Sequence, residues 1–139
     1  MLAIDANIFL EVLLDQEKSS ECQEFLQKVL RGEIRAMASD FTVDGVLLAM
    51  ERNGLRWKSM KNFLISLMAY KNLIFYSPTI SDKIAAAELM QSRSLDFEDS
   101  LTLQCAVAAQ CKGLVSFDSD FNRIKEMKKY TPGEILKEF

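Results

Sequence analysis

Four aspartates stand near points where this sequence of 139 residues leaves a short apolar run or enters a helical pattern. Asp5 and Asp118 directly end predicted strands, and Asp44 and Asp99 fall within about the first turn of predicted helices. Carboxylates that crowd together repel one another unless a cation neutralises them. Mg²⁺ and Mn²⁺ prefer oxygen ligands and can activate water against a phosphate ester. If the fold brings these four side chains together, their chemistry predicts metal-assisted hydrolysis of a phosphodiester.

The amino-acid composition limits which catalytic groups and which function classes are possible. Histidine is absent, which removes the commonest general base and the commonest transition-metal ligand. The net charge of −3 gives the whole molecule no long-range attraction to a nucleic-acid backbone, which proteins bind chiefly through Lys and Arg. A passive nucleic-acid-binding module is therefore disfavoured, whereas an enzyme that meets phosphate through divalent cations is not.

Residues 1–139 are expected to form a single domain. The sequence is 49% hydrophobic and 27% charged, as in ordinary globular proteins, and its two prolines and five glycines argue against linkers. The odd set Cys22, Cys105 and Cys111 has no C-x-x-C pair, which predicts reduced packing residues. Neither a signal peptide nor a run of about 18 apolar residues is visible, so no membrane contact and a cytoplasmic location are expected.

Apolar runs of strand length alternate with pairs of amphipathic stretches of helix length. Strands are expected over residues 1–4, 33–39, 73–76 and 114–117, with a weak edge strand near Tyr130. Helices are expected from 6 to 14, from a cap at Ser19 or Ser20 to Gly32, from 41 to 52, from 57 to 70, from the capping box Thr79-x-x-Asp82 onward, from 95 to 110, and in a C-terminal turn. This order predicts an α/β fold, a three-layer α/β/α sandwich with a central parallel sheet of about four to five strands. Because the carboxyl ends of parallel strands share one edge, the four aspartates are expected to meet there.

Two surface patterns bear on partners. The helix over 57–70 carries an apolar stripe that is expected to pack in the core, and this helix should form a hairpin with the one before it. The stripe consists of Trp57, Met60, Leu64, Leu67 and Met68. Two basic groups could contact an RNA backbone or an acidic partner. They are Arg52, Arg56, Lys58 and Lys61 in the first group, and Arg123, Lys125, Lys128 and Lys129 in the second.

Four motifs together resemble the PIN domain, especially the VapC-type toxins of prokaryotic toxin–antitoxin pairs. They occur in the family's order and span nearly the whole chain. The motifs are Ile4-Asp5-Ala6-Asn7, Ser39-Asp40-Phe41-Thr42-Val43-Asp44, Leu95-Asp96-Phe97-Glu98-Asp99-Ser100-Leu101 and Leu114-Val115-Ser116-Phe117-Asp118-Ser119-Asp120-Phe121. The resemblance implies an endoribonuclease that depends on Mg²⁺ or Mn²⁺, acts as a toxin, forms a homodimer and has a small antitoxin protein as its partner.

The resemblance also implies which residues act. It assigns catalysis and metal binding to Asp5, Asp44, Asp99 and Asp118, with Asp120 as an auxiliary metal ligand. In that scheme the acids hold one or two metal ions, and an activated water attacks the phosphate in line.

Three positions refine this comparison. Asn7 and Ser116 match the small polar residues with which the family orients its acids. Asp44 departs from the pattern, because the family usually has Glu there. One methylene less shortens the reach of the carboxylate, so either the helix lies closer or the metal affinity is reduced.

Simpler roles are open for each acid. Asp5 could cap the helix that follows it, Asp96-x-x-Asp99 could cap another, and Asp118 could form a turn. Asp44 could be a solvated helix residue.

Two other functions are also open. One is a phosphoacceptor signalling domain, which also gathers Asp residues around Mg²⁺ at strand ends. Against it, the last confident strand ends in an acid where a receiver would carry Lys, and no acidic pair follows the first strand. The other is a PIN-like scaffold with weak or no catalysis. Asp44, where the family usually has Glu, is the feature that supports this alternative.

Overall fold

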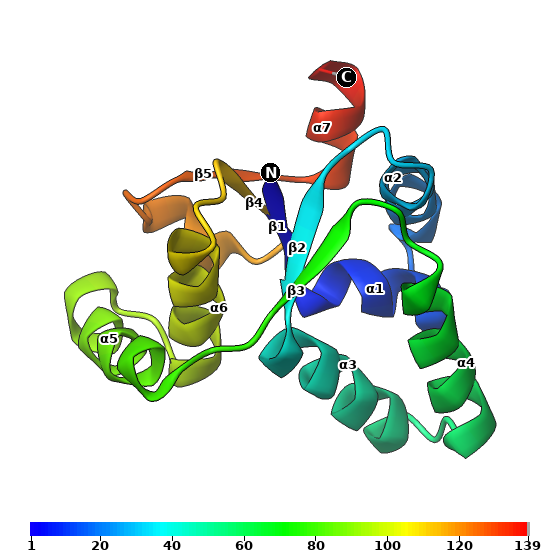
Figure 1. Cartoon of the computed structure of the whole chain (residues 1–139), viewed down its shortest axis with the longest axis horizontal. Helices are drawn as coiled ribbons and strands as arrows, with labels where there is room; N and C mark the ends of the chain where they lie inside the picture. The colour runs from blue at the N-terminus through cyan, green and yellow to red at the C-terminus, as the bar shows by residue number, and fades with distance from the viewer. Residues whose placement is uncertain (139) are drawn as a thin grey trace.

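A five-stranded sheet in the order β3-β2-β1-β4-β5 lies at the centre of the computed structural model, which describes residues 1–138 (Figure 1). All four pairings are parallel, and Leu2 lies beside both Ala36 and Gly113. The strands are β1 (Leu2–Ile4), β2 (Ala36–Ser39), β3 (Leu73–Tyr76), β4 (Gly113–Val115) and β5 (Lys128–Tyr130). The predicted parallel α/β fold is confirmed, and the weak strand near Tyr130 is β5 at the edge of the sheet.

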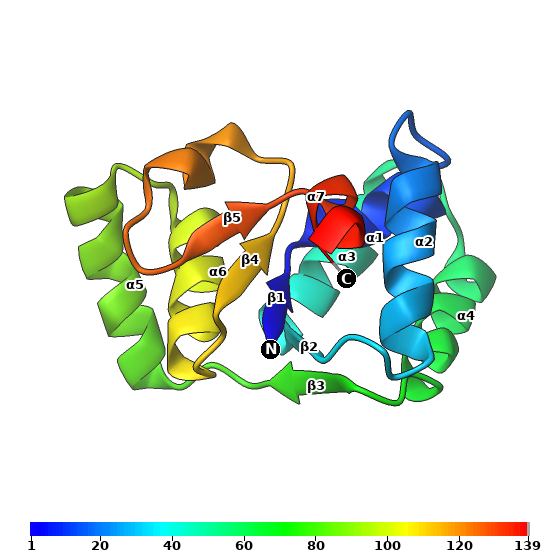
Figure 2. The same cartoon turned by 90° about the horizontal axis from the view of Figure 1, so that it is seen from above.

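Helices cover both faces of the sheet. They are α1 (Ala6–Leu13), α2 (Ser19–Leu30), α3 (Asp40–Arg52), α4 (Trp57–Met68), α5 (Ile80–Arg93), α6 (Phe97–Ala108), the 3₁₀ helix η1 (Ser119–Arg123) and α7 (Pro132–Glu138). Alternate side chains of β1 point to opposite faces: Leu2 and Ile4 pack with α1 to α4 and α7, and Ala3 packs with α5, α6 and η1. Figure 2 shows the two groups of helices on either side of the sheet.

Local sequence signals set several of the helix ends. The predicted capping box is present, since Thr79 Oγ1 accepts a hydrogen bond from Asp82 N at 3.1 Å and Asp82 Oδ2 accepts one from Thr79 N at 2.9 Å. The expected serine cap of α2 is wrong: Lys18 is the N-cap, and Ser19 is already helical. Lys18 N donates to Glu11 Oε2 at 2.7 Å. This contact holds the backbone before α2 so that the helix begins one residue earlier than expected.

The apolar stripe of α4 is only partly in the core, which corrects the sequence prediction. Leu67 is buried together with Phe63, whose ring packs edge-on against that of Phe9 in α1. Trp57 and Met68 are 65% and 84% exposed. The reason is visible in Figure 1, where α3 packs on α1 and α4 diverges from α3 instead of closing a tight hairpin. An apolar surface is therefore left open beside these two helices.

Two further expectations can be compared with the structure. Cys22, Cys105 and Cys111 are free and buried, as predicted for packing residues. No helix within residues 1–138 is long and apolar enough to cross a membrane.

Candidate metal centre

Asp5 lies where β1 ends and α1 begins. Its carboxylate accepts hydrogen bonds from Ala6 N at 2.8 Å, from Asn7 Nδ2 at 3.2 Å and from Ser116 Oγ at 2.6 Å. The first of these makes Asp5 the N-cap of α1. The capping role considered from the sequence is therefore real, and the same carboxylate also faces the end of β4.

Asn7 and Ser116 connect the ends of the two central strands. Asn7 Nδ2 donates to Ser116 Oγ at 3.2 Å, and the backbone N–H of Asp118 donates to the same oxygen at 3.0 Å. Ser116 is fully buried, so these contacts are shielded from water. Together they fix the orientation of Asp5 relative to Asp118.

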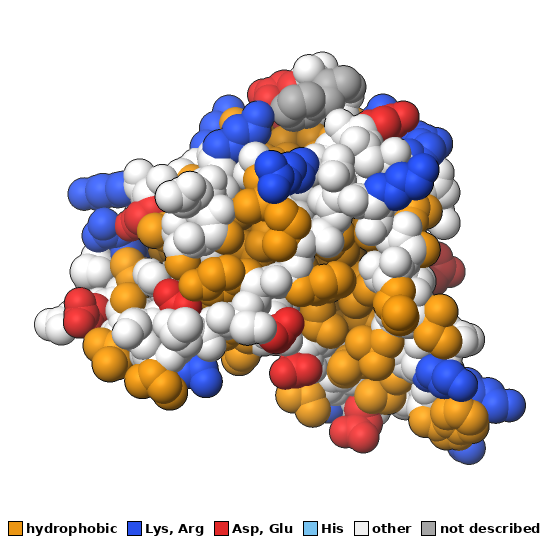
Figure 3. Space-filling model, in the orientation of Figure 1, with side chains coloured by type: hydrophobic (Ala, Val, Ile, Leu, Met, Phe, Trp, Pro, Cys, Tyr) orange, Lys and Arg blue, Asp and Glu red, His pale blue; other side chains and the backbone are white. Residues whose placement is uncertain are grey.

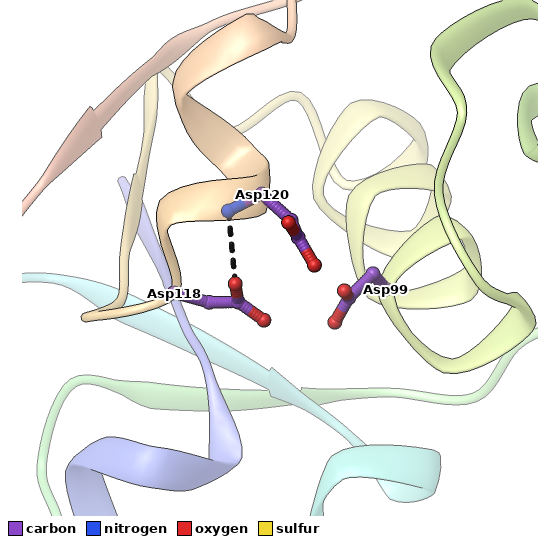
Figure 4. Close-up of side chains that lie close together, drawn as sticks. All are labelled: Asp99, Asp118 and Asp120. Carbon is purple, nitrogen blue, oxygen red and sulfur yellow. Dashed lines mark hydrogen bonds between the residues drawn. The ribbon is translucent and has the colours of Figure 1, made fainter.

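Three carboxylates meet beside this network. Among residues 1–138, Asp99 from α6 and Asp118 and Asp120 from the start of η1 each place one carboxylate oxygen within 4.8 Å of the other two (Figure 4). Asp118 accepts a hydrogen bond from Asp120 N at 2.9 Å, so it forms the turn and belongs to the group at the same time. Oxygen ligands of this kind, with no thiolate or imidazole, fit Mg²⁺ or Mn²⁺.

The helix cap at the start of α6 comes from Asp96. Its Oδ1 accepts a hydrogen bond from the backbone N–H of Asp99 at 2.8 Å. The sequence allowed the pair Asp96-x-x-Asp99 to be nothing more than a cap. The structure separates the two roles, because Asp96 supplies the cap and the side chain of Asp99 turns toward Asp118 and Asp120 (Figure 4).

The electrostatics of Asp99 reflect this crowding. Burial, as the largest cause, and the negative charges of Asp118, Asp96, Asp5 and Asp120, in that order of size, together raise its pKa to about 7. Asp99 is therefore a partly buried carboxyl that also lies in the field of four other carboxylates. A divalent cation at this place would offset their repulsion.

Asp5 shares the same field. Burial raises its pKa, the hydrogen bonds from Ser116 and Ala6 oppose that rise, and the charges of Asp118 and Glu98 add to it. Glu98 lies in the first turn of α6, one residue before Asp99. Its charge acts on Asp5 because α6 packs on the sheet, with contacts to β2 and β4, a proximity that the sequence does not show.

The positions of Asp44 and Asp120 differ from what the sequence predicted, since Asp44 was expected in the metal site and Asp120 only as an auxiliary ligand. Asp44 is exposed on α3 and lies outside the three-carboxylate group; with Asp40 it borders a hollow of about 430 Å³ between α3 and α4. Asp120, expected as an auxiliary ligand, is inside the group and also lies 3.4 Å from Arg123 Nη2. The sequence contained an indication of this, because two acids separated by one residue in a tight turn, Asp118-Ser119-Asp120, can place both carboxylates in the same site.

The raised pKa of Asp99 gives a testable pH dependence. The native state binds a proton at Asp99 more readily than the unfolded chain, whose carboxyl titrates near 3.8. The contribution of Asp99 to the stability of the metal-free protein should therefore be full below about pH 3.8, fall as the pH rises, and be lost above about pH 7. Thermal melts of chelator-treated protein across this range measure the effect.

Two variants complete the pH experiment. Asp99→Asn should flatten the pH dependence, whereas Asp15→Asn, at an exposed turn, should leave it as in the parent. A parent protein that melts at the same temperature at pH 5.5 and pH 8 would contradict the crowding of Asp99.

Comparison with known proteins places this geometry in context. The family model for the PIN domain matches residues 2–120. No curated protein matches the sequence.

Several solved structures share the fold. The VapC20 toxin of Mycobacterium tuberculosis, described as cleaving the sarcin-ricin loop, matches with a TM-score of 0.69 at 13% identity, over 88% of this chain and 93% of that one. A toxin–antitoxin complex from Klebsiella pneumoniae gives a TM-score of 0.71 at 16% identity, over 95% and 98% of the two chains. VapBC2 from Rickettsia felis, bound to a DNA fragment from its promoter, gives 0.70 at 14% identity, over 94% and 97%.

Proposed function

The chain belongs to the PIN domain family, and from that premise we propose that it is an endoribonuclease that depends on Mg²⁺ or Mn²⁺. The observation that carries the proposal is the group formed by Asp99, Asp118 and Asp120, with one oxygen of each within 4.8 Å of the others. Asp5 contributes to the same field and is held by Ser116.

Each residue of the centre has a distinct task in this proposal. Asp99, Asp118 and Asp120 would hold the ion, and Asp5 would add negative charge beside them. A bound divalent cation would supply charge neutralisation at the phosphate and a lower pKa for an attacking water. Ser116 and Asn7 keep the carboxylate of Asp5 in one orientation. The first backbone N–H groups of α1 and α3, which directly follow β1 and β2, favour anionic oxygens at this edge.

The phosphoacceptor alternative fits the architecture less well. The strand order here is β3-β2-β1-β4-β5, whereas receiver-like doubly wound domains have the order 2-1-3-4-5. The scaffold alternative differs from the proposal only in turnover, so an activity measurement separates them.

We further propose that the protein is a toxin with a small antitoxin partner. Solved complexes of toxins with antitoxins share its fold. The partner surface would be the hollow of about 670 Å³ at the start of α4, where Trp57, Met60 and Leu64 are bordered by the cations Arg56 and Lys61 and by the acid Glu51. Apolar side chains of the partner would pack in this hollow, and its acidic residues would face the two cations.

A homodimer is part of the same proposal. Ile80 and Ile84 are 71% and 58% exposed and lie one turn apart on the outer side of α5. Two copies of this face could bury them against each other.

Metal dependence is the direct test of the proposed reaction. The purified protein should cleave single-stranded RNA with Mg²⁺ or Mn²⁺, lose this activity with chelator, and regain it when excess Mn²⁺ is added, because the acidic centre alone cannot stabilise a phosphate charge. Cleavage products resolved on a denaturing gel measure the rate. Equal cleavage in chelator would refute the proposal. Phosphorylation of an aspartate by a small phosphodonor, without RNA cleavage, would favour the phosphoacceptor reading.

A further inference from the structure

Two phenylalanines form a pair at the edge of the sheet where the strands end. Phe41 is the second residue of α3, which follows β2, and Phe97 is the first residue of α6. Their ring centroids lie 6.3 Å apart and the ring planes are inclined at 76°, so the rings pack edge to face. We name Phe41 and Phe97 the aromatic pair. Figure 3 shows apolar and acidic side chains side by side on the surface over the ends of the strands.

One ring of the aromatic pair is anchored and the other is open to solvent. Phe41 is partly buried and packs against the core on the face of the sheet that α5 and α6 cover. Phe97 is 40% exposed. In an edge-to-face pair each ring leaves at least one of its faces uncovered by the other ring. Phe97 therefore presents aromatic surface to solvent from a position that its contact with Phe41 helps to fix.

The exposed ring belongs to the same helix turn as a residue of the candidate metal centre. Phe97 is two residues before Asp99 in the first turn of α6. Three aromatic side chains are exposed within residues 1–138, namely Trp57, Phe75 and Phe97. Of these, only Phe97 lies in an element that also supplies a carboxylate to the centre. A substrate held at the centre would therefore pass this ring.

The spacing of the strands sets how far the aromatic pair lies from the centre. Phe41 follows β2 and Asp118 follows β4, and β1 is the one strand between them. Two strand spacings amount to about 10 Å. Stacked nucleotides rise about 3.4 Å each. A base held on the pair would thus lie within about three nucleotides of a phosphate held at the metal centre.

A polar hollow of about 250 Å³ opens beside Phe41 and indicates what kind of group would pack there. Its other lining residues are Asp40, Asp44, Ser77, Pro78 and Lys83. Apart from the proline, they carry both hydrogen-bond donors and acceptors. An unpaired nucleobase stacks on an aromatic ring through its face and forms hydrogen bonds through its edge. An apolar side chain of a protein would bury the polar groups without partners, which is unfavourable, so the lining favours a base.

We propose that the aromatic pair stacks one unpaired base of the RNA substrate, within about three nucleotides of the scissile phosphate. This inference rests on the proposed ribonuclease function. Stacking gives a protein with a net charge of −3 a hold on RNA that does not depend on cations. Because every base has a flat aromatic face, this hold has little sequence preference. A base inside a duplex is already stacked and paired, so the pair selects single-stranded RNA.

The experiment separates the ring of Phe97 from its apolar volume. Phe97→Ala and Phe97→Leu remove the ring, and Phe97→Tyr keeps it. The probe is a labelled single-stranded RNA of about 12 nucleotides, and its Kd is measured by fluorescence anisotropy in chelator, where no cleavage is expected. The Ala and Leu variants should both bind about tenfold more weakly than the parent, the loss expected for one stacked base, and the Tyr variant should bind within about twofold of the parent.

Two controls exclude simpler causes of weak binding. Trp57→Ala removes an exposed ring at the start of α4, outside the metal centre, and should bind RNA within about twofold of the parent. Phe97→Leu should gain as much melting temperature from Mn²⁺ as the parent, since no carboxylate is changed. Equal weakening by Trp57→Ala and Phe97→Leu, or a smaller gain from Mn²⁺ in Phe97→Leu, would overturn the proposal. The second result would mean that Phe97 supports Asp99 and not the RNA.

A cycle of protein and RNA changes locates the stacked base. RNA carrying one abasic nucleotide at successive positions around the cleaved bond is assayed with Mn²⁺. In the parent, an abasic nucleotide at one position within about three nucleotides of that bond should raise KM about tenfold. In Phe97→Leu the same abasic nucleotide should raise KM no further, because the stack is already lost. Multiplying losses, or no sensitive position, would show that the aromatic pair holds no base.

Failure of the aromatic pair gives a different result from failure of the proposed reaction. Weaker RNA binding by Phe97→Leu, with no metal-dependent cleavage by the parent, would retain the pair as an RNA-binding element and reject the ribonuclease. Metal-dependent cleavage by the parent, with the same Kd and KM in Phe97→Leu, would retain the ribonuclease and reject the pair. Duplex RNA bound by the parent as tightly as single-stranded RNA would also reject the pair.

Discussion

Replacement of Asp99 by Asn is expected to lower kcat/KM for RNA cleavage about a thousandfold, equivalent to a loss of about 4 kcal/mol of transition-state stabilisation. The reason is that Asp99 comes from α6, whereas Asp118 and Asp120 come from η1. Without Asp99 the two remaining carboxylates hold an ion from one side only. The rate is measured at saturating Mn²⁺ on a labelled RNA.

Substitutions of the other acids should show how much each contributes to cleavage. Asp5→Asn should also abolish cleavage, because it removes charge beside the ion and changes the hydrogen bonds with Ser116 and Asn7 that orient this edge of the site. Asp120→Asn, at an exposed position beside Arg123, should be milder and recover at higher Mn²⁺, because Asp99 and Asp118 still hold the ion. Asp44→Asn should lose less activity than Asp99→Asn, since Asp44 lies outside the three-carboxylate group. Asp15→Asn controls for the chemical change. If Asp44→Asn were as damaging as Asp99→Asn, the centre would have to extend to α3.

Binding of Mn²⁺ is expected to stabilise the parent protein by about 2.7 kcal/mol at a concentration one hundred times the Kd, because the ion binds the native group and not the unfolded chain. For a domain of this length the melting temperature should rise by roughly 5–10 °C. Asp99→Asn should gain much less from Mn²⁺. Without metal at neutral pH it should melt at the same temperature as the parent or higher, since one of the mutually repelling charges is removed.

Asp99 is a better probe for this measurement than Asp5. Asp5 caps α1 and accepts hydrogen bonds from Ser116 and Asn7, so Asp5→Asn changes these hydrogen bonds as well as the charge. The melts are compared across a Mn²⁺ titration at fixed ionic strength, with Asp15→Asn as the matched variant. Equal stabilisation of the parent and Asp99→Asn by Mn²⁺ would exclude the shared site.

The sequence by itself determined the order and type of the elements. Short apolar runs and paired amphipathic stretches predict alternating strands and helices, and these fold as the five-stranded parallel sheet with helices on both faces. Local capping chemistry placed the start of α5 at Thr79 and Asp82. Residues whose position follows directly from a strand end, such as Asp5, are predictable because the chain itself carries them to the edge of the sheet.

Only the tertiary structure decided which acids share a volume and which faces are left open. Asp99 meets Asp118 and Asp120 because α6 packs against the end of β4, whereas Asp44 points to solvent from the body of α3. Trp57 and Met68 are exposed for a related reason, since α4 diverges from α3; Phe63 and Leu67 are buried in the core and Met60 packs against it in part. Periodicity defines an apolar stripe on a helix, but the packing angle of that helix decides how much of the stripe is buried.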